Sequence, residues 1–555
     1  MTLHRCLLLS LTALACVASL EVHAAKPAPA GGPKLVVVLV VDGLPQEQVS
    51  RYRNQFGQGG LRRLLDEGAS FSSAHQAHGI TYTAVGHAAI LTGAYPNQHG
   101  IIANEWIDAK TGAEVYCTDD INHRYLNDEA RTPKDGTSPA RLRVSTLGDE
   151  MRYASGNRAK VVAVSGKDRG AILLAGKTGT AYMYMEKSGN FASSDFYMKA
   201  HPAWATEFTA TKPQDRYYAK RWQKLLAETA YEHDEHDDPR SPRVGTDATF
   251  PASYSSVSGG FEPDYYQALK KSPFLDELTL DFARAAVIGE NLGKNPAGVA
   301  DLLGVSLSAH DYVNHAFGPE SQLSHDHLQR VDRMLAGFFG FLDKQVGMDN
   351  VLVVFTSDHG FPNIPDFSHA RKVGGQRLDG DLMLDELNKA LAARFKAEKL
   401  VKKSMLPTVM LDYDLVEARG LNREEIETFA ARFILTWDGV SEVFTRSQLE
   451  RGETSGTHAG ILMQRAWHRQ LSGDLIVVQK PNWIFKYGKN GGTTHGSPYS
   501  YDTNVPLMIM GKRWIKPGYY GDYTEVVDIA PTLAHLLRVR KPSAAFGRVL
   551  TEVLR

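Results

Sequence analysis

The sequence predicts an α/β fold with a central, mostly parallel sheet, helices on both of its faces and cap insertions. Residues 34–41 form a valine-rich run that is uninterruptedly apolar after Lys34, and residues 160–165 and 351–357 repeat this pattern around apolar centres. A continuous apolar run of this length suits a strand that is buried on both faces, as in a parallel sheet. Helical patterns lie between the runs, and such alternation is typical of a sheet sandwiched between helices.

Further elements follow in order along the chain. Residues 46–67 have helical spacing, residues 301–308 resemble a weaker buried strand, and further helices are expected over residues 84–91, 274–292, 325–346 and 527–537. Two segments, near 170–270 and 370–490, break the alternation, and we interpret them as insertions or a cap on the sheet. The second contains predicted helices over 381–402 and 421–437 and a strand over 474–479. The chain returns to the core over 494–510.

The bulk composition indicates a soluble globular protein with a local rather than a global binding site. Its 555 residues are 43% hydrophobic and 23% charged. The formal net charge is −1, so no overall field favours nucleic acid or an anionic membrane. Any phosphate binding must therefore come from a local arrangement of charges.

The N-terminus has the pattern of an export signal. Arg5 precedes an apolar run over residues 6–20 that is too short to span a bilayer comfortably, and small residues at Val22 and Ala24 suit signal cleavage. We predict a signal peptide over residues 1–24, a flexible lead-in over 25–33 and a catalytic domain over 34–545, hence a periplasmic or secreted protein. The alternative is a lipoprotein processed at Cys16, although Leu14 fits a lipobox poorly.

The cysteines restrict the chemistry of any metal site. Cleavage after Ala24 leaves only Cys117, so an internal disulfide and a thiolate zinc cluster are both excluded. A metal would have to be held by histidine and carboxylate side chains.

Candidate metal ligands are spread along the chain, mostly just after predicted strands, where sites form in open α/β sheets. They comprise three aspartates and three histidines, enough to supply three ligands to each of two ions: Asp42, Asp311, His315, Asp358, His359 and His495. Asp311 and His315 are four residues apart and so share one face of a helix. Singly, each has an ordinary interpretation, such as a helix cap for Asp42 or a structural histidine for His495.

Two threonines precede the predicted helix over residues 84–91. A threonine at a helix N-terminus is ordinarily a cap, but it becomes a nucleophile where a metal lowers its pKa and the helix dipole favours a bound phosphate. Local sequence alone leaves both Thr81 and Thr83 open as that residue.

The segment that contains these threonines resembles the alkaline phosphatase superfamily, and more narrowly the bacterial alkaline phosphatases with a threonine nucleophile. The resemblance is carried by the run from Thr83 to His87, by Thr92-Gly93, Pro96 and His99-Gly100-Ile101, and by Asn104-Glu105-Trp106. Nucleotide pyrophosphatase/phosphodiesterases are related. From Asp42 to about Pro506 the chain is similar to this superfamily, which implies an alkaline-phosphatase-like sandwich.

The resemblance implies roles for individual residues and a cofactor of two Zn²⁺ ions. Thr83 would be the nucleophile, because it stands four residues before His87. Asp42, Thr83, Asp358 and His359 would surround one zinc, and Asp311, His315 and His495 would hold the other. Asn104 would touch a phosphoryl oxygen, and Lys167 and Arg169 match the pair that marks phosphomonoesterases in the family.

The implied activity is zinc-dependent hydrolysis of small phosphate monoesters through a phosphothreonine. A monoester carries one more negative charge than a diester, which Lys167 and Arg169 could bind. The alternatives are a phosphodiesterase or nucleotide pyrophosphatase, a cofactor-independent mutase on fold grounds, and a non-catalytic exported protein that binds zinc or phosphate. A sulfatase is disfavoured because no Cys- or Ser-x-Pro-x-Arg motif is present. We expect no nucleic-acid partner, no membrane span and a monomer.

Overall fold

A ten-stranded sheet lies at the centre of the computed structural model, which describes residues 31–127, 129–218, 220–232, 234, 252–253, 263–454, 456–486 and 492–555. The strand order is β19-β2-β18-β11-β1-β10-β5-β6-β7, with β20 paired to β2. The strands are β1 (Leu35–Val41), β2 (Ala69–His75), β5 (Val161–Ser165), β6 (Thr180–Tyr184), β7 (Phe191–Ala192), β10 (Asp301–Leu307), β11 (Val351–Thr356), β18 (Asn504–Met510), β19 (Gly518–Tyr520) and β20 (Thr524–Glu525). From β11 to β6 neighbouring strands run parallel, whereas β18 is antiparallel to both of its neighbours.

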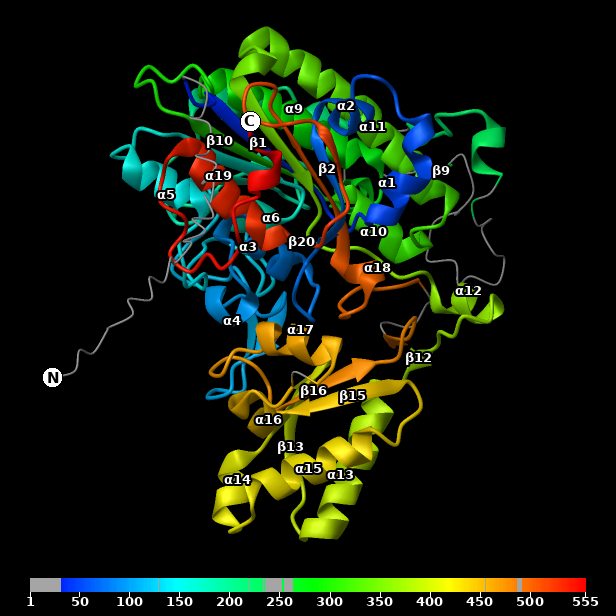
Figure 1. Cartoon of the computed structure of the whole chain (residues 1–555). Coiled ribbons are helices and arrows are strands. Elements are labelled where there is room, and N and C mark those ends of the chain that lie inside the picture. Colours follow the sequence, from blue (N-terminus) through cyan, green and yellow to red (C-terminus); the bar gives the residue numbers. More distant parts are fainter. Residues whose placement is uncertain are drawn as a thin grey trace, which may run out of the picture.

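Helices cover both faces of this sheet, and β1 shows why its sequence is continuously apolar. Val37 and Leu39 pack in one core with α1 (Gln46–Tyr52), α2 (Leu61–Glu67), α9 (Pro273–Gly289) and α11 (Gln322–Gln345). Val36 and Val38 face the opposite core, which includes α3 (Thr83–Thr92), α5 (Leu147–Ala154), α6 (Asp168–Ala175) and α19 (Ile529–Leu537). Alternate residues thus enter different cores, and the predicted mixed α/β fold is confirmed (Figure 1).

The parallel central strands bring distant segments to one edge of the sheet. Asp42 follows β1, Lys167 lies two residues after β5, α10 (Ala309–Phe317) follows β10, and Asp358 lies two residues after β11. Because the paired strands are in register, their carboxyl ends lie side by side. The four segments therefore meet at one place.

A second, four-stranded antiparallel sheet lies apart from the first, in the lower part of Figure 1. We call it the cap sheet; it is formed by β13 (Val401–Met405), β14 (Thr408–Leu411), β16 (Leu475–Gln479) and β15 (Val440–Thr445). With α13 (Gly380–Phe395) and α15 (Arg423–Ile434) it encloses a separate apolar core. The domain boundaries themselves stay predictions; β6 and β7, within the first predicted insertion, belong to the central sheet.

Two predicted helices differ from the structure. The helix expected over 46–67 is interrupted between α1 and α2, where Gly60 lies so close to Asp332 that a Cβ atom would be 2.0 Å from its backbone oxygen. The helix expected over 381–402 ends at Phe395, since Lys396 adopts a left-handed conformation, and β13 follows. The spacing of apolar residues carries no signal for these helix ends, because each is set by the backbone conformation or by a contact with a distant segment.

Some expectations concern residues outside the described part of the chain. The signal peptide over residues 1–24 lies there, so cleavage and localisation stay predictions. Among the described residues, no helix combines the length and apolar character needed to cross a bilayer.

Candidate active site

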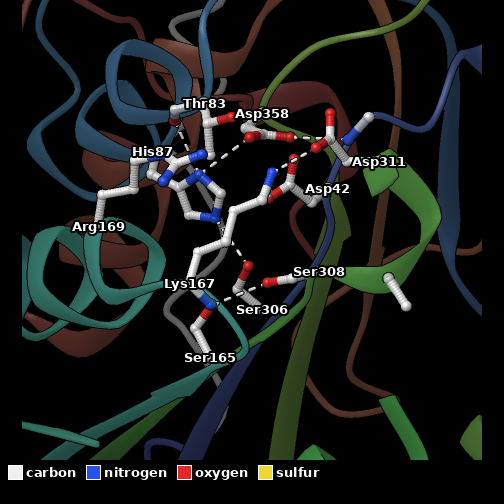
Figure 2. A network of polar contacts seen from close by, with 12 residues as sticks. Asp42, Thr83, His87, Ser165, Lys167, Arg169, Ser306, Ser308, Asp311 and Asp358 are labelled. Atoms are coloured by element: carbon white, nitrogen blue, oxygen red, sulfur yellow. Dashed lines mark hydrogen bonds and ion pairs between the residues drawn. The ribbon is translucent and has the colours of Figure 1, made fainter. Parts of the chain in front are cut away.

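Three buried carboxylates form the floor of the candidate site. The Nζ atom of Lys167 lies 2.9 Å from Oδ2 of Asp42 and 2.5 Å from Oδ2 of Asp311, so these two acids flank one ammonium group (Figure 2). The third acid, Asp358, accepts a hydrogen bond of 3.1 Å from the backbone N–H of Gly43, the residue after Asp42. The ends of β1, β10 and β11 thus supply one carboxylate each.

Three histidines face these carboxylates. The Nε2 atom of His359 lies 3.5 Å from Oδ1 of Asp42 and 3.4 Å from Oδ2 of Asp358. The Nε2 atoms of His315 and His495 each lie 3.4 Å from Oδ1 of Asp311. All six residues named as metal ligands in the sequence are therefore brought together.

Backbone carbonyls set the orientation of each of these imidazole rings. The Nδ1 atom of His315 donates to the Thr493 oxygen at 2.9 Å, and that of His495 donates to the Thr81 oxygen at 2.7 Å. His359 donates in the same way to the Gly360 oxygen at 3.0 Å. With the proton on Nδ1, each Nε2 atom keeps a lone pair directed at the acids, which is the arrangement of a metal-binding histidine.

The donor set fits divalent metal ions. Oδ1 of Asp42 and Oδ1 of Asp311 are buried and have no hydrogen-bond donor within the part of the chain that the structure describes. A buried carboxylate oxygen without a partner is costly unless it binds a cation. Imidazole nitrogen and carboxylate oxygen without thiolate suit zinc, although these donors also accept other divalent ions.

Distances alone give two ligand groups that differ from the predicted sets. One contains Asp311, His359 and His495, and the other contains Asp42, His87 and Asp358. His359 lies near acids of both groups, but its Nε2 atom is closer to Asp42 (3.5 Å) and Asp358 (3.4 Å) than to Asp311 (3.9 Å).

His87 is better placed to hold a ligand than to be one. Its Nδ1 atom lies 2.9 Å from the backbone oxygen of Thr83 and 3.0 Å from Oδ2 of Asp358. Two acceptors at that nitrogen require the proton there, and Nε2 then accepts from the Ser306 hydroxyl at 2.8 Å. Neither nitrogen keeps a lone pair for a metal, so His87 orients Asp358.

Thr83 is the first residue of α3, and its hydroxyl oxygen lies 3.4 Å from Nε2 of His359. The hydroxyl of Thr81 donates instead to the backbone oxygen of Ser497 at 3.0 Å. Gly86 allows α3 to approach, because a Cβ atom there would lie 2.0 Å from the backbone oxygen of Asp358. Of the two hydroxyl groups, that of Thr83 is therefore the one that lies beside a metal-ligand candidate.

Positively charged and polar groups surround the same position. The backbone N–H of Ala84 donates to Oδ1 of Asn104 at 2.9 Å, which holds the Asn104 side chain beside the first turn of α3. Lys167 and Arg169 flank the first residue of α6, and Arg169 extends toward the end of the site that holds Thr83 (Figure 2). These groups can bind the oxygens of an anion at the N-terminus of α3.

The carboxylates are electrostatically unequal. Burial raises the pKa of Asp42 well above its usual range, and the neighbouring charge of Asp358 adds to the rise. Burial acts in the same direction on Asp311, but the adjacent Lys167 outweighs it and the pKa falls well below normal. Burial lowers the pKa of His315 to about 4 and that of His359 to about 3, so both rings are neutral at pH 7.

Sequence reasoning missed the residues that orient the site. His87 was noted only as part of a motif, and Tyr116, Asp168 and Asp502 were not singled out. Asp502 accepts hydrogen bonds from the backbone N–H groups of Gly496 and Ser497 at 3.1 and 2.8 Å and so holds the loop of His495. Asp168 could have been suspected from its place between two basic residues, but nothing in the local sequence marks the others.

Comparison with known proteins identifies the family. The profile of the family described as "Type I phosphodiesterase / nucleotide pyrophosphatase" matches residues 36–500. A protein of Myroides odoratus named calcium-transporting ATPase is 34% identical, with 98% of both chains covered. The alkaline phosphatase PafA of Elizabethkingia meningoseptica is 33% identical over 94% of both chains.

Solved structures agree with the sequence comparison. A crystal structure of wild-type alkaline phosphatase PafA superposes with a TM-score of 0.86 at 31% identity, covering 94% of this chain and 99% of that one. The chain therefore belongs to the type I phosphodiesterase/nucleotide pyrophosphatase family and, within it, to the group of PafA-like alkaline phosphatases.

Proposed function

We propose that this chain is a zinc-dependent phosphate monoester hydrolase that acts through a phosphothreonine on Thr83. The observation that carries the proposal is the position of the Thr83 hydroxyl, at the N-terminus of α3 and 3.4 Å from His359, among buried acids and imidazoles. The kinship with alkaline phosphatases supports the reaction class.

The ligand sets that we propose follow the chemistry of each side chain. Asp42, Thr83, Asp358 and His359 hold one ion, since Thr83 and both acids lie around His359. Asp311, His315 and His495 hold the other, since both imidazoles face one oxygen of Asp311. Two such ions, when bound, would supply Lewis-acid stabilisation of the developing charge and would lower the pKa of a bound hydroxyl.

The chain's own residues then carry out two displacements at phosphorus. The Thr83 oxygen forms a bond to phosphorus as the ester P–O bond breaks, and the alcohol leaves with the proton that Thr83 gives up. Water then attacks the phosphothreonine, which restores the Thr83 hydroxyl and releases inorganic phosphate. The positive end of the α3 dipole favours the phosphoryl group, and the Asn104 NH₂ group and Arg169 bind its non-bridging oxygens, where charge must be stabilised in the transition state. Two inversions predict net retention of configuration at phosphorus.

The preference for monoesters rests on Lys167 and Arg169. A monoester presents an additional anionic oxygen, and both cations lie at the site: Nζ of Lys167 is 2.9 Å from Oδ2 of Asp42, and Arg169 extends toward the end that holds Thr83. A phosphate diester has one anionic oxygen fewer, so two cationic side chains beside its phosphoryl group would stabilise it less. The family profile also includes phosphodiesterases, so diester hydrolysis is the second candidate function.

Metal analysis combined with a substrate panel tests the proposal. Zinc-loaded protein is assayed with nitrophenyl phosphate, bis-nitrophenyl phosphate and ATP, the last because of the name of the Myroides odoratus relative. We expect the monoester to give a kcat/KM at least tenfold above the diester, loss of activity with a chelator and recovery with zinc. A higher value for the diester would replace the proposal with the second candidate, and inversion with a chiral phosphate monoester would remove the covalent step.

A further inference from the structure

A hydrogen-bonded chain through Tyr116 and Asp168 holds the guanidinium of Arg169. The Nη1 atom of Arg169 donates to the Tyr116 hydroxyl oxygen at 3.3 Å. That hydroxyl donates in turn to Oδ1 of Asp168 at 2.6 Å. Oδ2 of Asp168 accepts from the backbone N–H of Gly136, so the carboxylate is held at both oxygens.

Burial makes this chain of contacts rigid. The side chains of Asp168 and Arg169 are only 13% and 18% exposed, and Tyr116 is buried. Burial raises the pKa of Tyr116 well above its usual range, and the charge of Asp168 adds to the rise, so the hydroxyl keeps the proton that it donates. Hydrogen bonds that involve charged partners in a poorly solvated place are the stronger kind.

One edge of the Arg169 guanidinium remains for an anion. Its Nε atom is buried and has no acceptor among the described residues, whereas Nη1 is occupied by Tyr116. Arginine binds phosphate oxygens through adjacent N–H groups in a fixed fork. The hydrogen bond from Nη1 to Tyr116 therefore selects the Arg169 rotamer in which the remaining N–H groups of the guanidinium can meet a phosphate oxygen.

Tyr116 belongs to a two-stranded hairpin, and Asn104 directly precedes the first strand of that hairpin. Strands β3 (Glu105–Ile107) and β4 (Glu114–Tyr116) pair Glu105 with Tyr116. The backbone N–H of Cys117 donates to the backbone oxygen of Asn104 at 2.9 Å. The ring of Tyr116 packs with Ile102 and Trp106 in a small core. One rigid hairpin thus sets the relative positions of Asn104 and of the anchor of Arg169.

We propose that the Tyr116 hydroxyl, held by Asp168, is the positioning group that orients Arg169 and thereby sets the selectivity for phosphate monoesters. This inference rests on the proposed function, since it concerns the same substrate. Tyr116 acts through Arg169 and is not itself a catalytic residue. Without the hydroxyl, the long arginine side chain must be ordered by the substrate at each binding event, which weakens binding of the additional oxygen.

A double-mutant cycle tests the inference. Tyr116→Phe keeps the packed ring and removes only the hydroxyl, and it is compared with wild type, Arg169→Ala and the double variant at saturating zinc. The matched control is Tyr184→Phe, which removes a buried hydroxyl that donates to the Tyr266 backbone oxygen at 2.9 Å. The measured quantities are kcat/KM for the nitrophenyl monoester and diester, the inhibition constant of inorganic phosphate and the melting temperature.

We expect Tyr116→Phe to lower kcat/KM for the monoester and weaken phosphate inhibition, each by about tenfold, as for loss of a hydrogen bond to a charged group. Diester hydrolysis should change less than about twofold. In the Arg169→Ala background, Tyr116→Phe should have almost no further effect, because the group that it orients is gone.

Equal effects of Tyr116→Phe in both backgrounds, or on both substrates, would overturn the inference and assign the tyrosine a structural role. A Tyr116→Phe variant with the kcat/KM and phosphate inhibition of wild type would also overturn the inference. A higher kcat/KM of the wild-type enzyme for the diester would instead refute the proposed function. That outcome needs no variant, so it can be told apart from failure of the inference. A loss of monoesterase activity in Tyr184→Phe as large as in Tyr116→Phe would also count against the inference.

Discussion

The Nδ1 atom of His495 donates a hydrogen bond of 2.7 Å to the backbone oxygen of Thr81. The Thr81 hydroxyl donates in turn to the backbone oxygen of Ser497 at 3.0 Å, so two contacts join the segment before α3 to the loop of His495. Thr83, two residues later, turns its hydroxyl toward His359. The two threonines therefore have different tasks, and their variants should differ.

Thr81→Val should weaken zinc binding without removing the nucleophile. Loss of a buried hydrogen bond costs about 1–3 kcal/mol of unfolding free energy, and disturbance of a contact behind a metal ligand costs about 10- to 100-fold in metal affinity. Activity should return with excess zinc. Zinc titration and urea unfolding measure both effects; a variant that stays inactive in excess zinc would contradict this role.

Thr83→Ala should lose at least about 1,000-fold in kcat, since a covalent route without its nucleophile falls to residual catalysis. Its zinc content should stay within about twofold of wild type, because Asp42, Asp358 and His359 remain. Steady-state kinetics and metal analysis are the measurements, and acid-quenched protein should carry phosphothreonine in wild type only. Substantial turnover by Thr83→Ala would exclude the proposed nucleophile.

Lys167→Ala and Arg169→Ala should each lower kcat/KM for a monoester by about 100-fold, as for removal of one group that stabilises transition-state charge. The diester should lose less than about tenfold, because it lacks the additional anionic oxygen. The measurement is the ratio of kcat/KM for the monoester to kcat/KM for the diester, at saturating zinc, in each variant and in wild type. Equal losses on both substrates would show that the pair does not discriminate between them.

Gly86→Ala should impair catalysis through the backbone. The added Cβ atom would lie 2.0 Å from the Asp358 backbone oxygen, so α3 or the Asp358 loop must shift. We expect destabilisation of about 1–3 kcal/mol and a fall in kcat of up to about 100-fold. Gly340→Ala in α11 is the control, because its Cβ atom would meet nothing within 4 Å; it should be neutral or slightly stabilising. Similar behaviour of the two variants would refute the steric argument.

The stability of the metal-free protein should depend on His315, whose side chain is partly buried. Burial lowers the pKa of His315 to about 4, below its ordinary value of 6.5. Between these values the unfolded chain binds a proton that the folded chain does not, so the stabilising difference is complete above pH 6.5 and is lost as pH falls toward 4. His315 thus contributes on the order of 2 kcal/mol to this fall.

A variant isolates that contribution, because other groups act in the opposite direction. Burial raises the pKa of Asp502 to about 7, and protonation of this acid in the folded state favours folding as pH falls. Urea unfolding at pH 7.5, 5.5 and 4.5 should therefore be compared between wild type and His315→Gln. The loss of stability on acidification should be smaller in the variant, and parallel pH profiles would disprove the linkage.

Much of the fold could be predicted because its signals are local. The valine-rich run of β1 and its repeats in β5 and β11 were identified, since a strand that is buried on both faces has no polar alternation to obscure it. Helix ends were less predictable. Gly60 and Lys396 interrupt periodic segments for reasons that lie in the backbone, and the pairing of β6 and β7 with the central sheet depends on contacts far away in the chain.

The residue types of the site, and the strand ends from which they project, can be read from the chain alone, because hydrophobic runs and a short motif are properties of neighbouring residues. The folded chain sets which nitrogen of each histidine carries the proton. It also places Thr81 as an anchor for the loop of His495, turns the Thr83 hydroxyl toward His359 and brings Tyr116 to Arg169. Those choices depend on hydrogen-bond partners from distant segments, and such partners exist only once the strands and helices have packed.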